Sequence, residues 1–190
     1  MIDESRVLPE VFYDRPVLDV APDLLNKLLV TGTGDDRRVG RIVEVEAYGG
    51  EDDPGSHGWR GITPRTTVMF GPPGRWYIYL SYGVHWCPNV VVGPEGTCAA
   101  VLLRAVEPLE GIEAIRQRRG EKIRNRDLTN GPGKLGQAFD FDESLYGEPI
   151  AASPVQIVDD GTAPPARPKR TRRIGLSEGR GEDSLWRFTP

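Results

Sequence analysis

The chain has 190 residues and a mass of 21.0 kDa, a length that fits one domain with its own hydrophobic core. Its 23 Gly and 17 Pro make up about a fifth of the residues, well above average usage, which favours short strands and turns over a helix bundle. It carries 24 Lys and Arg against 28 Asp and Glu, and the formal net charge of −4, taken alone, argues against a nucleic-acid partner.

Cysteine usage and motif content exclude several classes of protein. The only two cysteines, Cys87 and Cys98, rule out a disulfide scaffold, so we expect free thiols and a cytoplasmic protein. With His57 and His85 they match no zinc spacing, and we expect no metal and no cofactor. The sequence has no phosphate-binding glycine loop and no Gly-x-Ser-x-Gly motif. It shows neither a secretory signal nor an apolar stretch that could span a bilayer, so we expect no membrane partner.

A helix is the first element predicted in chain order. Apolar residues recur between Asp19 and Leu29, with Pro22 near the start and Gly32 beyond the end, a pattern typical of a helix that begins with proline and ends at glycine. We expect residues 1–17, which precede it, to be irregular.

The next predicted element is a strand over Arg41–Tyr48, in which polar and apolar side chains alternate. Side chains two residues apart leave the same face of a strand, so Glu44, Glu46 and Tyr48 share one face. A carboxylate buried there beside an aromatic ring could act as a general base. The same pattern fits two surface carboxylates on a half-exposed strand, and the residues alone favour this second interpretation.

A polar segment over residues 49–67 follows this strand and is rich in Gly, Pro and Asp. It is unusually long for a loop within a compact domain, which favours a functional role. It contains His57, although a single loop histidine is most often only a solvated side chain.

A second strand is predicted over Arg75–Ser81, with Tyr77 and Tyr79 on one side. We interpret Tyr77 as core packing, and Trp76, on the opposite side, as a core anchor. A turn at Tyr82 follows the strand and would direct this ring outward, where an aromatic side chain can wedge between bases.

The rest of the sequence predicts further short strands, two helices and an irregular connector. In chain order these are strands at Asn89–Val92 and Cys98–Val106, a helix at Pro108–Gly120 with Ile112 and Ile115 on its inner side, a short helix from Gly131 to Ala138, and an irregular segment at residues 161–170. No internal repeat is visible, so we expect one α+β domain, residues 1–190, rich in antiparallel strands.

Charge is distributed in opposed blocks. Residues 1–53 carry a net charge of −7 and residues 135–166 a net charge of −6, whereas residues 54–94 contain three Arg and no acid. This acid-free block is also the most aromatic part of the chain, a combination that suits a polyanion whose bases can be stacked. Two basic clusters have the composition that neutralises phosphates, although composition alone favours a solvated surface: Arg116, Arg118, Arg119, Lys122, Arg124 and Arg126, and then Arg167, Lys169, Arg170, Arg172 and Arg173.

Four long motifs occur in order along the chain. They are GRIVEVEAYGGEDDPGSH (Gly40–His57), TPRTTVMFGPPGRWYIYLSYGVHWCPNVV (Thr63–Val91), CAAVLLRAVEPLEGIEAIRQRRG (Cys98–Gly120) and NGPGKLGQAF (Asn130–Phe139), with a weaker match in RRIGL and LWRF near the end. Together they resemble the alkyladenine (3-methyladenine) DNA glycosylase family, monofunctional repair enzymes that excise alkylated purines. The ordered set covers nearly the whole chain and is far more specific than any single motif.

The resemblance implies a catalytic group and a base-binding pocket. Glu46 is similar to the general base that activates water for attack at the anomeric carbon. Tyr48 and His57 resemble two walls that stack on the extruded purine, and Tyr79 resembles the facing wall. Asn89 resembles the side chain near the pocket floor that disfavours the exocyclic amine of normal guanine.

The resemblance also implies contacts to DNA. Tyr82 is similar to the side chain that enters the duplex and fills the gap left by the flipped nucleotide, and Arg104 and Lys134 resemble contacts to the nucleotide or its phosphate. The implied fold is a single mixed domain around a curved antiparallel β-sheet with a few flanking helices. The implied partner is double-stranded DNA containing damaged purines, and we expect a monomer.

The expected reaction is base flipping followed by hydrolysis of the N-glycosidic bond of an alkylated purine, with deaminated purines as further candidates, leaving an abasic site. Lys27 is the only lysine before Lys122, so we expect no Schiff-base lyase step. Two other functions use parts of the same pattern. A non-catalytic nucleic-acid-binding module of the same fold stays open, whereas a carbohydrate hydrolase using Glu44 and Glu46 is disfavoured because carboxylates two apart on one strand do not straddle a sugar.

Overall fold

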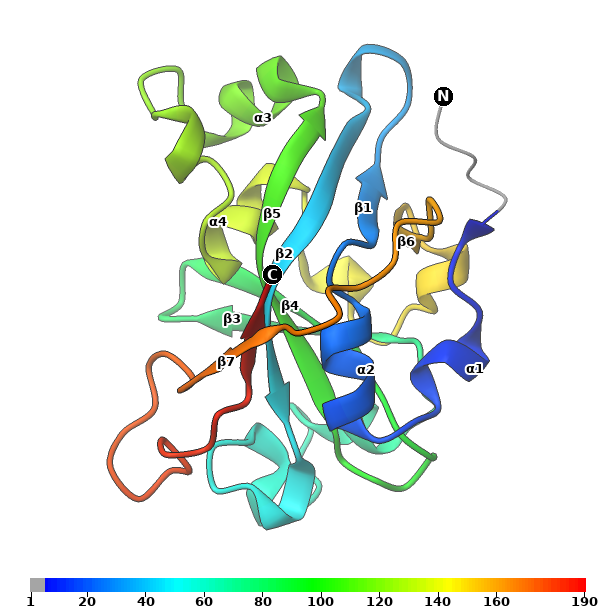
Figure 1. Cartoon of the computed structure of the whole chain (residues 1–190), viewed down its shortest axis with the longest axis vertical. Helices are drawn as coiled ribbons and strands as arrows, with labels where there is room; N and C mark the ends of the chain where they lie inside the picture. Colours follow the sequence, from blue (N-terminus) through cyan, green and yellow to red (C-terminus); the bar gives the residue numbers. More distant parts are fainter. Residues whose placement is uncertain (1–5) are drawn as a thin grey trace.

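Two eleven-residue antiparallel strands, β2 (Arg38–Tyr48) and β5 (Ala100–Glu110), form the centre of the sheet in the computed structural model, which describes residues 6–190 (Figure 1). The order across the sheet is β3 (Trp76–Ser81), β4 (His85–Val91), β5, β2, β1 (Leu28–Thr31) and β6 (Val155–Val158). Two short strands, β7 (Lys169–Thr171) and β8 (Arg187–Thr189), pair with each other, and β8 also pairs with β2. All these pairings are antiparallel, which confirms the expected α+β fold.

Four α-helices accompany the sheet in residues 6–190: α1 (Glu10–Tyr13), α2 (Val17–Asp23), α3 (Ile112–Arg119) and α4 (Pro132–Ala138). Helix α2 packs on β2, β5 and β8, and lies in front of the sheet in Figure 1, whereas α4 packs on β4 and β5 and α3 packs on α4. Within the described part of the chain, no helix is both long and apolar enough to cross a membrane.

The sheet buries side chains on both faces. On β4, Val90 belongs to the main core, whereas its neighbour Val91 lies in a smaller cluster on the opposite face, together with Tyr77 and Ala100. This alternation follows from the period of two along a strand. The smaller cluster leaves room beside it for polar and aromatic side chains, and this second face carries the candidate site. Both cysteines are buried free thiols, as expected.

The early helix predicted over Asp19–Leu29 is wrong in its second half. Helix α2 ends at Asp23, and Leu28 and Leu29 lie in strand β1, fully buried between β2 and β6. The chain reverses at Asn26, whose φ of 68° cannot continue a right-handed helix. A strand buried on both faces is a continuous apolar run, which periodicity does not distinguish from a buried helical segment.

The helix predicted over Pro108–Gly120 is shorter in the structure, because β5 continues to Glu110 and α3 begins at Ile112. The change of direction takes place at Gly111, where φ is 75° and a Cβ would lie 2.1 Å from a backbone oxygen. Ile115 is buried as predicted, but Ile112 is 37% exposed, so that part of the prediction is wrong.

Other boundaries differ by a few residues. Strand β4 begins at His85 rather than at Asn89, and the short helix predicted from Gly131 is confirmed as α4. The segments expected to be irregular, 1–17 and 161–170, contain α1 and the first residues of β7, while residues 1–5 lie outside the described part.

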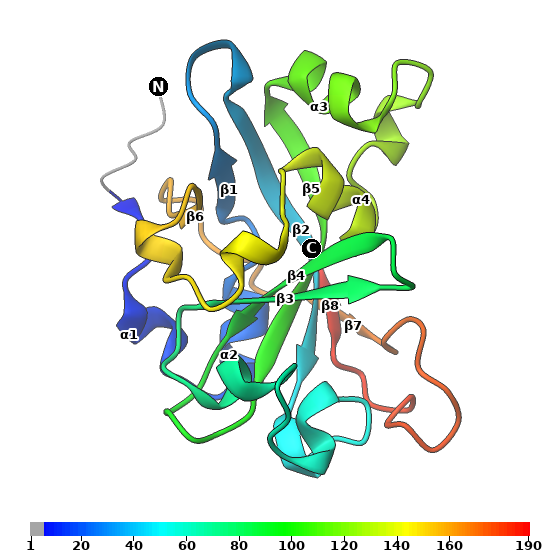
Figure 2. The same cartoon turned by 180° about the vertical axis from the view of Figure 1, so that it is seen from behind.

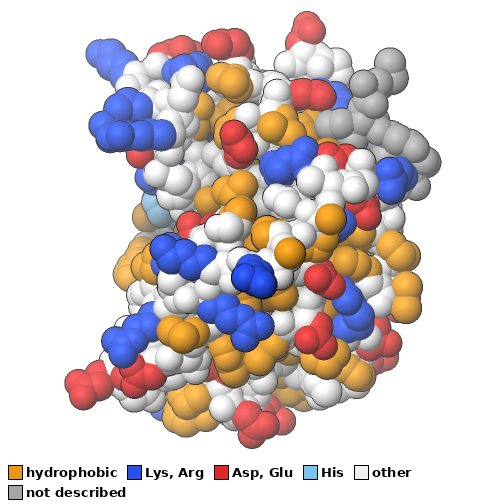
Figure 3. All heavy atoms as spheres, viewed as in Figure 1, with side chains coloured by type: hydrophobic (Ala, Val, Ile, Leu, Met, Phe, Trp, Pro, Cys, Tyr) orange, Lys and Arg blue, Asp and Glu red, His pale blue; other side chains and the backbone are white. Residues whose placement is uncertain are grey.

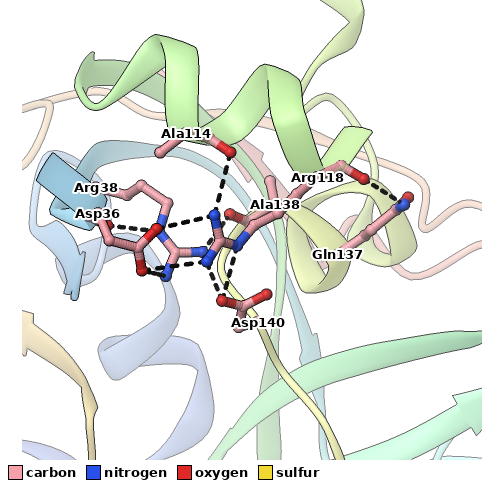
Figure 4. Close-up of polar contacts among 7 residues, drawn as sticks. All are labelled: Asp36, Arg38, Ala114, Arg118, Gln137, Ala138 and Asp140. Carbon is pink, nitrogen blue, oxygen red and sulfur yellow. Dashed lines mark hydrogen bonds and ion pairs between the residues drawn. The ribbon is translucent and has the colours of Figure 1, made fainter. Parts of the chain in front are cut away.

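An ion-pair network joins α3 and α4 to the start of β2 (Figure 4). Arg38, whose side chain is 2% exposed, donates to Asp140 at 3.0 Å and to Asp36 at 3.1 Å. Arg118 of α3 contacts the same two carboxylates at 2.7 and 2.9 Å. The Arg38 guanidinium also donates to the carbonyl of Ala138, the last residue of α4. The network therefore fixes both helices at one end of the sheet.

Candidate active site

One row of residues crosses four strands on the face opposite the main core. The register pairs Tyr77 of β3 with Asn89 of β4, and Asn89 with Leu102 of β5. Leu102 in turn pairs with Glu46 of β2. Directly opposed residues of neighbouring strands point to the same face, so these four side chains leave the sheet together.

A cavity of about 230 Å³ opens on this face. Strands β2 to β5 form one side of it, and two loops, around His57 and around Ile174, cover it; in Figure 2 these loops lie below and beside the β3–β4 hairpin. Six of the eight side chains with expected roles line the cavity: Tyr48, His57, Tyr79, Tyr82, Asn89 and Arg104. The sheet therefore gathers residues that are up to 56 positions apart in the sequence.

Glu46 lies directly behind the cavity wall, and its side chain has no exposed surface. Its Oε2 accepts hydrogen bonds from the Tyr48 hydroxyl at 2.8 Å and from Arg104 Nη1 at 3.2 Å. Its Oε1 accepts a hydrogen bond from the backbone N–H of Ile174 at 2.7 Å. All three donors belong to residues that line the cavity. The interpretation of Glu46 as a surface carboxylate is therefore wrong.

Arg104 is held between two carboxylates of β2. Its Nε donates to Glu44 Oε1 at 2.9 Å, and Arg187 of β8 donates to the same oxygen at 2.7 Å. Burial lowers the pKa of Arg104, but the negative charges of Glu46 and Glu44 outweigh it and raise that pKa above its ordinary value. The guanidinium thus stays charged beside the Glu46 carboxylate.

Three aromatic side chains form one wall of the cavity. The rings of His57 and Tyr79 meet edge to face, with centroids 4.6 Å apart, and His57 Nδ1 lies 2.8 Å from the Tyr77 hydroxyl. Arg65 approaches His57 Nε2 at 3.2 Å and stacks over Tyr79 at 5.1 Å. Desolvation, followed by the positive charge of Arg65, lowers the pKa of His57 to about 4. The imidazole is therefore neutral near neutral pH. Tyr77, which we expected only to pack in the core, therefore also contacts His57 through its hydroxyl.

The ring of Tyr48, which also lines the cavity, stacks on a buried arginine. The guanidinium carbon of Arg173 is 4.7 Å from the Tyr48 ring centroid and 5.1 Å from that of Trp186. Burial and the charge of Glu46 raise the pKa of Tyr48 well above its ordinary value. Tyr48 therefore remains a phenol that donates to Glu46.

Tyr82 lies at the tip of the β3–β4 hairpin and is 97% exposed. Its φ of 51° is unusual for a residue with a side chain and aims the ring away from the sheet, as the turn prediction expected. The Val84 N–H donates to the Ser81 carbonyl at 3.1 Å and closes this turn. The tip forms part of the cavity rim.

Asn89 and Lys134 occupy contrasting positions. Asn89 is 4% exposed, and its amide nitrogen donates to the carbonyls of Tyr77 and Cys87, both at 3.1 Å, which fixes its orientation in the cavity. Lys134 lies on α4 outside the cavity lining, and its Nζ donates to Asn130 Oδ1 at 2.7 Å. In residues 6–190 no three His, Cys, Asp or Glu side chains meet as a metal site.

The structure adds a buried ion pair that the sequence reasoning missed. Arg173 binds both carboxylate oxygens of Asp53, at 2.5 and 2.7 Å, and both side chains are almost fully buried. Arg173 also donates to the carbonyl of Ala47 at 3.0 Å, and the next residue, Ile174, donates to Glu46. The only sequence signal for this anchored segment is the RRIGL motif, and the charge pattern assigned its two arginines, Arg172 and Arg173, to a basic cluster.

Comparison with known proteins gives a consistent result over nearly the whole chain. The family model described as "Methylpurine-DNA glycosylase (MPG)" matches residues 11–190. A protein of Burkholderia lata named "Putative 3-methyladenine DNA glycosylase" is 50% identical over 187 residues, which are 97% of this chain and 88% of that protein. Proteins with the same name from Streptomyces avermitilis and Methanocella arvoryzae are each 46% identical, over 95% and 96% of this chain and 86% and 91% of their own lengths.

The family match and the geometry agree, since the motifs that carry the resemblance form the two loops, the hairpin and the strands around one cavity. This chain belongs to the methylpurine-DNA glycosylase family.

Proposed function

We propose that this protein is a monofunctional DNA glycosylase, which flips an alkylated purine out of double-stranded DNA and hydrolyses its N-glycosidic bond. Family membership and the names of the relatives support glycosylase activity. The observation that carries the mechanism is the fully buried carboxylate of Glu46 directly behind a cavity walled by aromatic rings.

The cavity suits a flat, electron-poor ring. An alkylated purine carries positive charge, and the faces of Tyr48 and Tyr79 attract cations. A deaminated purine is neutral but has the same flat shape, so it is the further substrate class. Asn89, pinned by two backbone carbonyls, is a rigid group against which the base edge is checked.

In the proposed reaction, water attacks the anomeric carbon while Glu46 takes its proton. The N-glycosidic bond breaks and its electron pair leaves with the base, so a cationic purine departs as a neutral molecule. The carboxylate also stabilises the positive charge that develops on the sugar. The Glu46 side chain has no exposed surface, so Arg104 or the segment at Ile174 moves aside when the nucleotide enters.

The cavity lining supports simple hydrolysis over a lyase step. A Schiff base needs a free amine at the anomeric carbon, and no lysine lines the cavity. Lys27 is buried elsewhere in an ion pair with Asp159 at 3.0 Å, and Lys134 lies on α4 outside the lining. We accordingly propose Arg104 and Lys134 as contacts to the nucleotide and the DNA, and Tyr82 as the intercalating side chain.

The test is Glu46→Gln, which keeps the shape of the side chain and removes its ability to take a proton. We expect single-turnover excision to fall by about 100-fold or more, while binding to a lesion-containing duplex is retained. Glu44→Gln is the matched control, because it neutralises the neighbouring carboxylate, which contacts the same arginine but is not the proposed base. We expect a smaller loss for this variant.

Two outcomes would contradict the proposal. Near-normal excision by Glu46→Gln would exclude this residue as the base. Tight binding without excision by the wild-type protein, across duplexes with 3-methyladenine, 7-methylguanine, hypoxanthine and an etheno adduct, would indicate a non-catalytic DNA-binding module of the same fold.

A further inference from the structure

A second hollow, of about 350 Å³, opens beside the base cavity. It lies between the loop at residues 54–60 and the loop at residues 175–180, which run side by side at the lower end of the molecule in both Figure 1 and Figure 2. His57 and Leu176 line both the hollow and the base cavity and so separate them. A strand that places one nucleotide in the base cavity therefore has its neighbouring backbone close to this hollow.

Two arginines stack on a partly exposed tryptophan in the hollow. The guanidinium carbon of Arg180 lies 5.1 Å from the Trp59 ring centroid, and that of Arg60 lies 5.6 Å from it. Trp59 itself is 37% exposed. Stacking uses the faces of a guanidinium and leaves its N–H edges free to donate, the geometry in which arginine binds phosphate. We call Trp59, Arg60 and Arg180 the Trp59 clamp.

In residues 6–190 no carboxylate forms an ion pair with the guanidinium group of Arg60 or Arg180. No Asp or Glu lines the hollow. Within residues 6–190, the Arg60 side chain makes no hydrogen bond or ion pair, and the Arg180 side chain has one long hydrogen bond, 3.4 Å, to the carbonyl of Pro54. By contrast, nearby Arg172 is paired with Asp183 at 2.6 Å.

Arg180 is presented by a fixed turn. The carboxylate of Glu182 accepts hydrogen bonds from the backbone N–H groups of Gly179 and Arg180, at 3.0 and 2.9 Å. This acid therefore binds the backbone of the turn and does not pair with the Arg180 guanidinium. Preorganised donors lose less entropy when they bind an anion.

We propose that the Trp59 clamp binds a backbone phosphate of the DNA strand, next to the nucleotide that enters the base cavity. This inference rests on the proposed function, since it assumes that the cavity receives a nucleotide from duplex DNA. Trp59 holds the two guanidinium groups in place, and Arg60 and Arg180 donate to the phosphate oxygens. The clamp thus anchors the strand on the far side of His57 from the base.

The first experiment measures the salt dependence of binding to a duplex with one tetrahydrofuran abasic-site analogue. The slope of log K against log salt is negative, and each lost phosphate contact makes it shallower by about 0.9. We expect Arg60→Gln and Arg180→Gln to weaken binding several-fold and to make this slope shallower, and Trp59→Leu to do the same, whereas Trp59→Phe, which keeps an aromatic face, retains more affinity.

Arg15→Gln is the matched control, because Arg15 also stacks on an aromatic ring, that of Phe12 at 4.7 Å, but lies between α1 and α2 outside both cavities. It changes the net charge by the same amount. A slope for the clamp variants equal to that of Arg15→Gln would overturn the proposal.

The second experiment locates the phosphate. A single neutral methylphosphonate is moved along the lesion strand, and affinity is measured for wild type and for Arg60→Gln/Arg180→Gln. We expect one position next to the lesion at which the substitution weakens wild type but has little further effect on the double variant. Additive losses at every position would overturn the proposal.

Single-turnover excision at saturating protein separates this inference from the proposed function. If wild type excises damaged purines and the clamp variants bind like the control, the clamp is wrong and the glycosylase activity stands. The opposite result is that wild type excises nothing, while the clamp variants show a shallower salt dependence of binding and no methylphosphonate effect. In that case the clamp stands and the catalytic proposal fails.

Discussion

His57 has a defined protonation state because of its neighbours. Arginine can only donate hydrogen bonds, and Arg65 Nη2 lies 3.2 Å from His57 Nε2 and 3.5 Å from Nδ1, so its positive charge faces the imidazole. His57 Nδ1 also lies 2.8 Å from the Tyr77 hydroxyl. Burial raises the pKa of Tyr77 to about 12, so this hydroxyl stays protonated throughout the working range. His57 is thus a neutral wall of the cavity and not an acid.

The lowered pKa of His57 predicts how stability depends on pH. The folded protein holds this pKa at about 4, below the ordinary value of 6.5, so the unfolded chain binds the proton more strongly. We expect the free energy of unfolding to fall as the pH is lowered from 6.5 towards 4. Urea unfolding of wild type and His57→Gln across this range measures the effect.

His57→Gln keeps a polar side chain but cannot titrate, so it should show a smaller loss of stability between pH 6.5 and 4. Equal slopes for the two proteins would contradict the assignment. Since His57 is neutral above its pKa, we also expect the excision rate of the wild-type protein to show no step near pH 6.5 that is due to His57. The pH profiles of wild type and His57→Gln should therefore have the same shape in that range.

At the scale of elements, the site depends on how the C-terminal segment is tied to β2. Arg173 anchors this segment through Asp53 and Ala47, and the adjoining Ile174 N–H reaches Glu46. Since the anchor and the hydrogen bond are neighbours in the chain, loss of the anchor frees the N–H from the carboxylate. Arg173 is in this sense a positioning residue.

We expect Arg173→Met to destabilise the fold by about 3–5 kcal/mol, because it leaves Asp53 buried without a partner. Among molecules that remain folded, the excision rate constant should fall more than the affinity for duplex. Arg172→Met is the matched control, since Arg172 is the preceding residue but pairs with Asp183 on the surface. Equal effects of the two substitutions on excision would contradict the role of the anchor.

A close contact between α4 and β4 supports the hairpin that carries Tyr82. A Cβ on Gly136 would lie 2.0 Å from the Trp86 carbonyl oxygen, and one on Gly133 would lie 2.6 Å from the His85 side chain. Only glycine therefore allows the helix to approach the strand this closely. The glycines of the NGPGKLG motif thus allow the close packing of α4 on β4, in addition to the place of this motif at the edge of the site.

At the scale of the whole molecule, the net charge predicts less about DNA binding than the pairing of individual charges does. Figure 3 shows basic and acidic side chains interspersed over the face in front of α2 and β7. In the first basic cluster, residues 116–126, several arginines form ion pairs within the protein. Arg118 is paired with Asp36 and Asp140, and Arg124 is paired with Asp127. In the acid-free block, Arg60 and Arg65 form no ion pair with any described carboxylate.

This difference predicts two classes of arginine variant. We expect Arg118→Gln to lower the free energy of unfolding by about 1–2 kcal/mol, since it breaks two charged hydrogen bonds, and to leave the salt dependence of DNA binding unchanged. Urea unfolding and binding titrations at several salt concentrations measure both quantities. A shallower salt dependence of DNA binding, with an unchanged free energy of unfolding, would show that Arg118 contacts phosphate instead.

Much of the site could be predicted from the sequence because it lies on regular strands. Alternation along β2 placed Glu46 and Tyr48 on one face, and the structure confirms this, with their side chains 2.8 Å apart. The same rule put Tyr77 and Tyr79 together on β3. It failed for Leu28 and Leu29, because β1 is buried on both sides and its sequence has no alternation to detect.

The sequence by itself determined the family, the antiparallel character of the fold, and which side chains of each strand share a face, since these depend on motifs and on local periodicity. Tertiary structure alone decided the register that aligns Tyr77, Asn89 and Glu46, the burial of Glu46 behind Arg104, and the Arg173–Asp53 anchor. It also decided which arginines remain unpaired around the two cavities. Contacts between residues more than 100 positions apart, as in that anchor, leave no periodic trace in the sequence, because only the closed sheet brings the partners together.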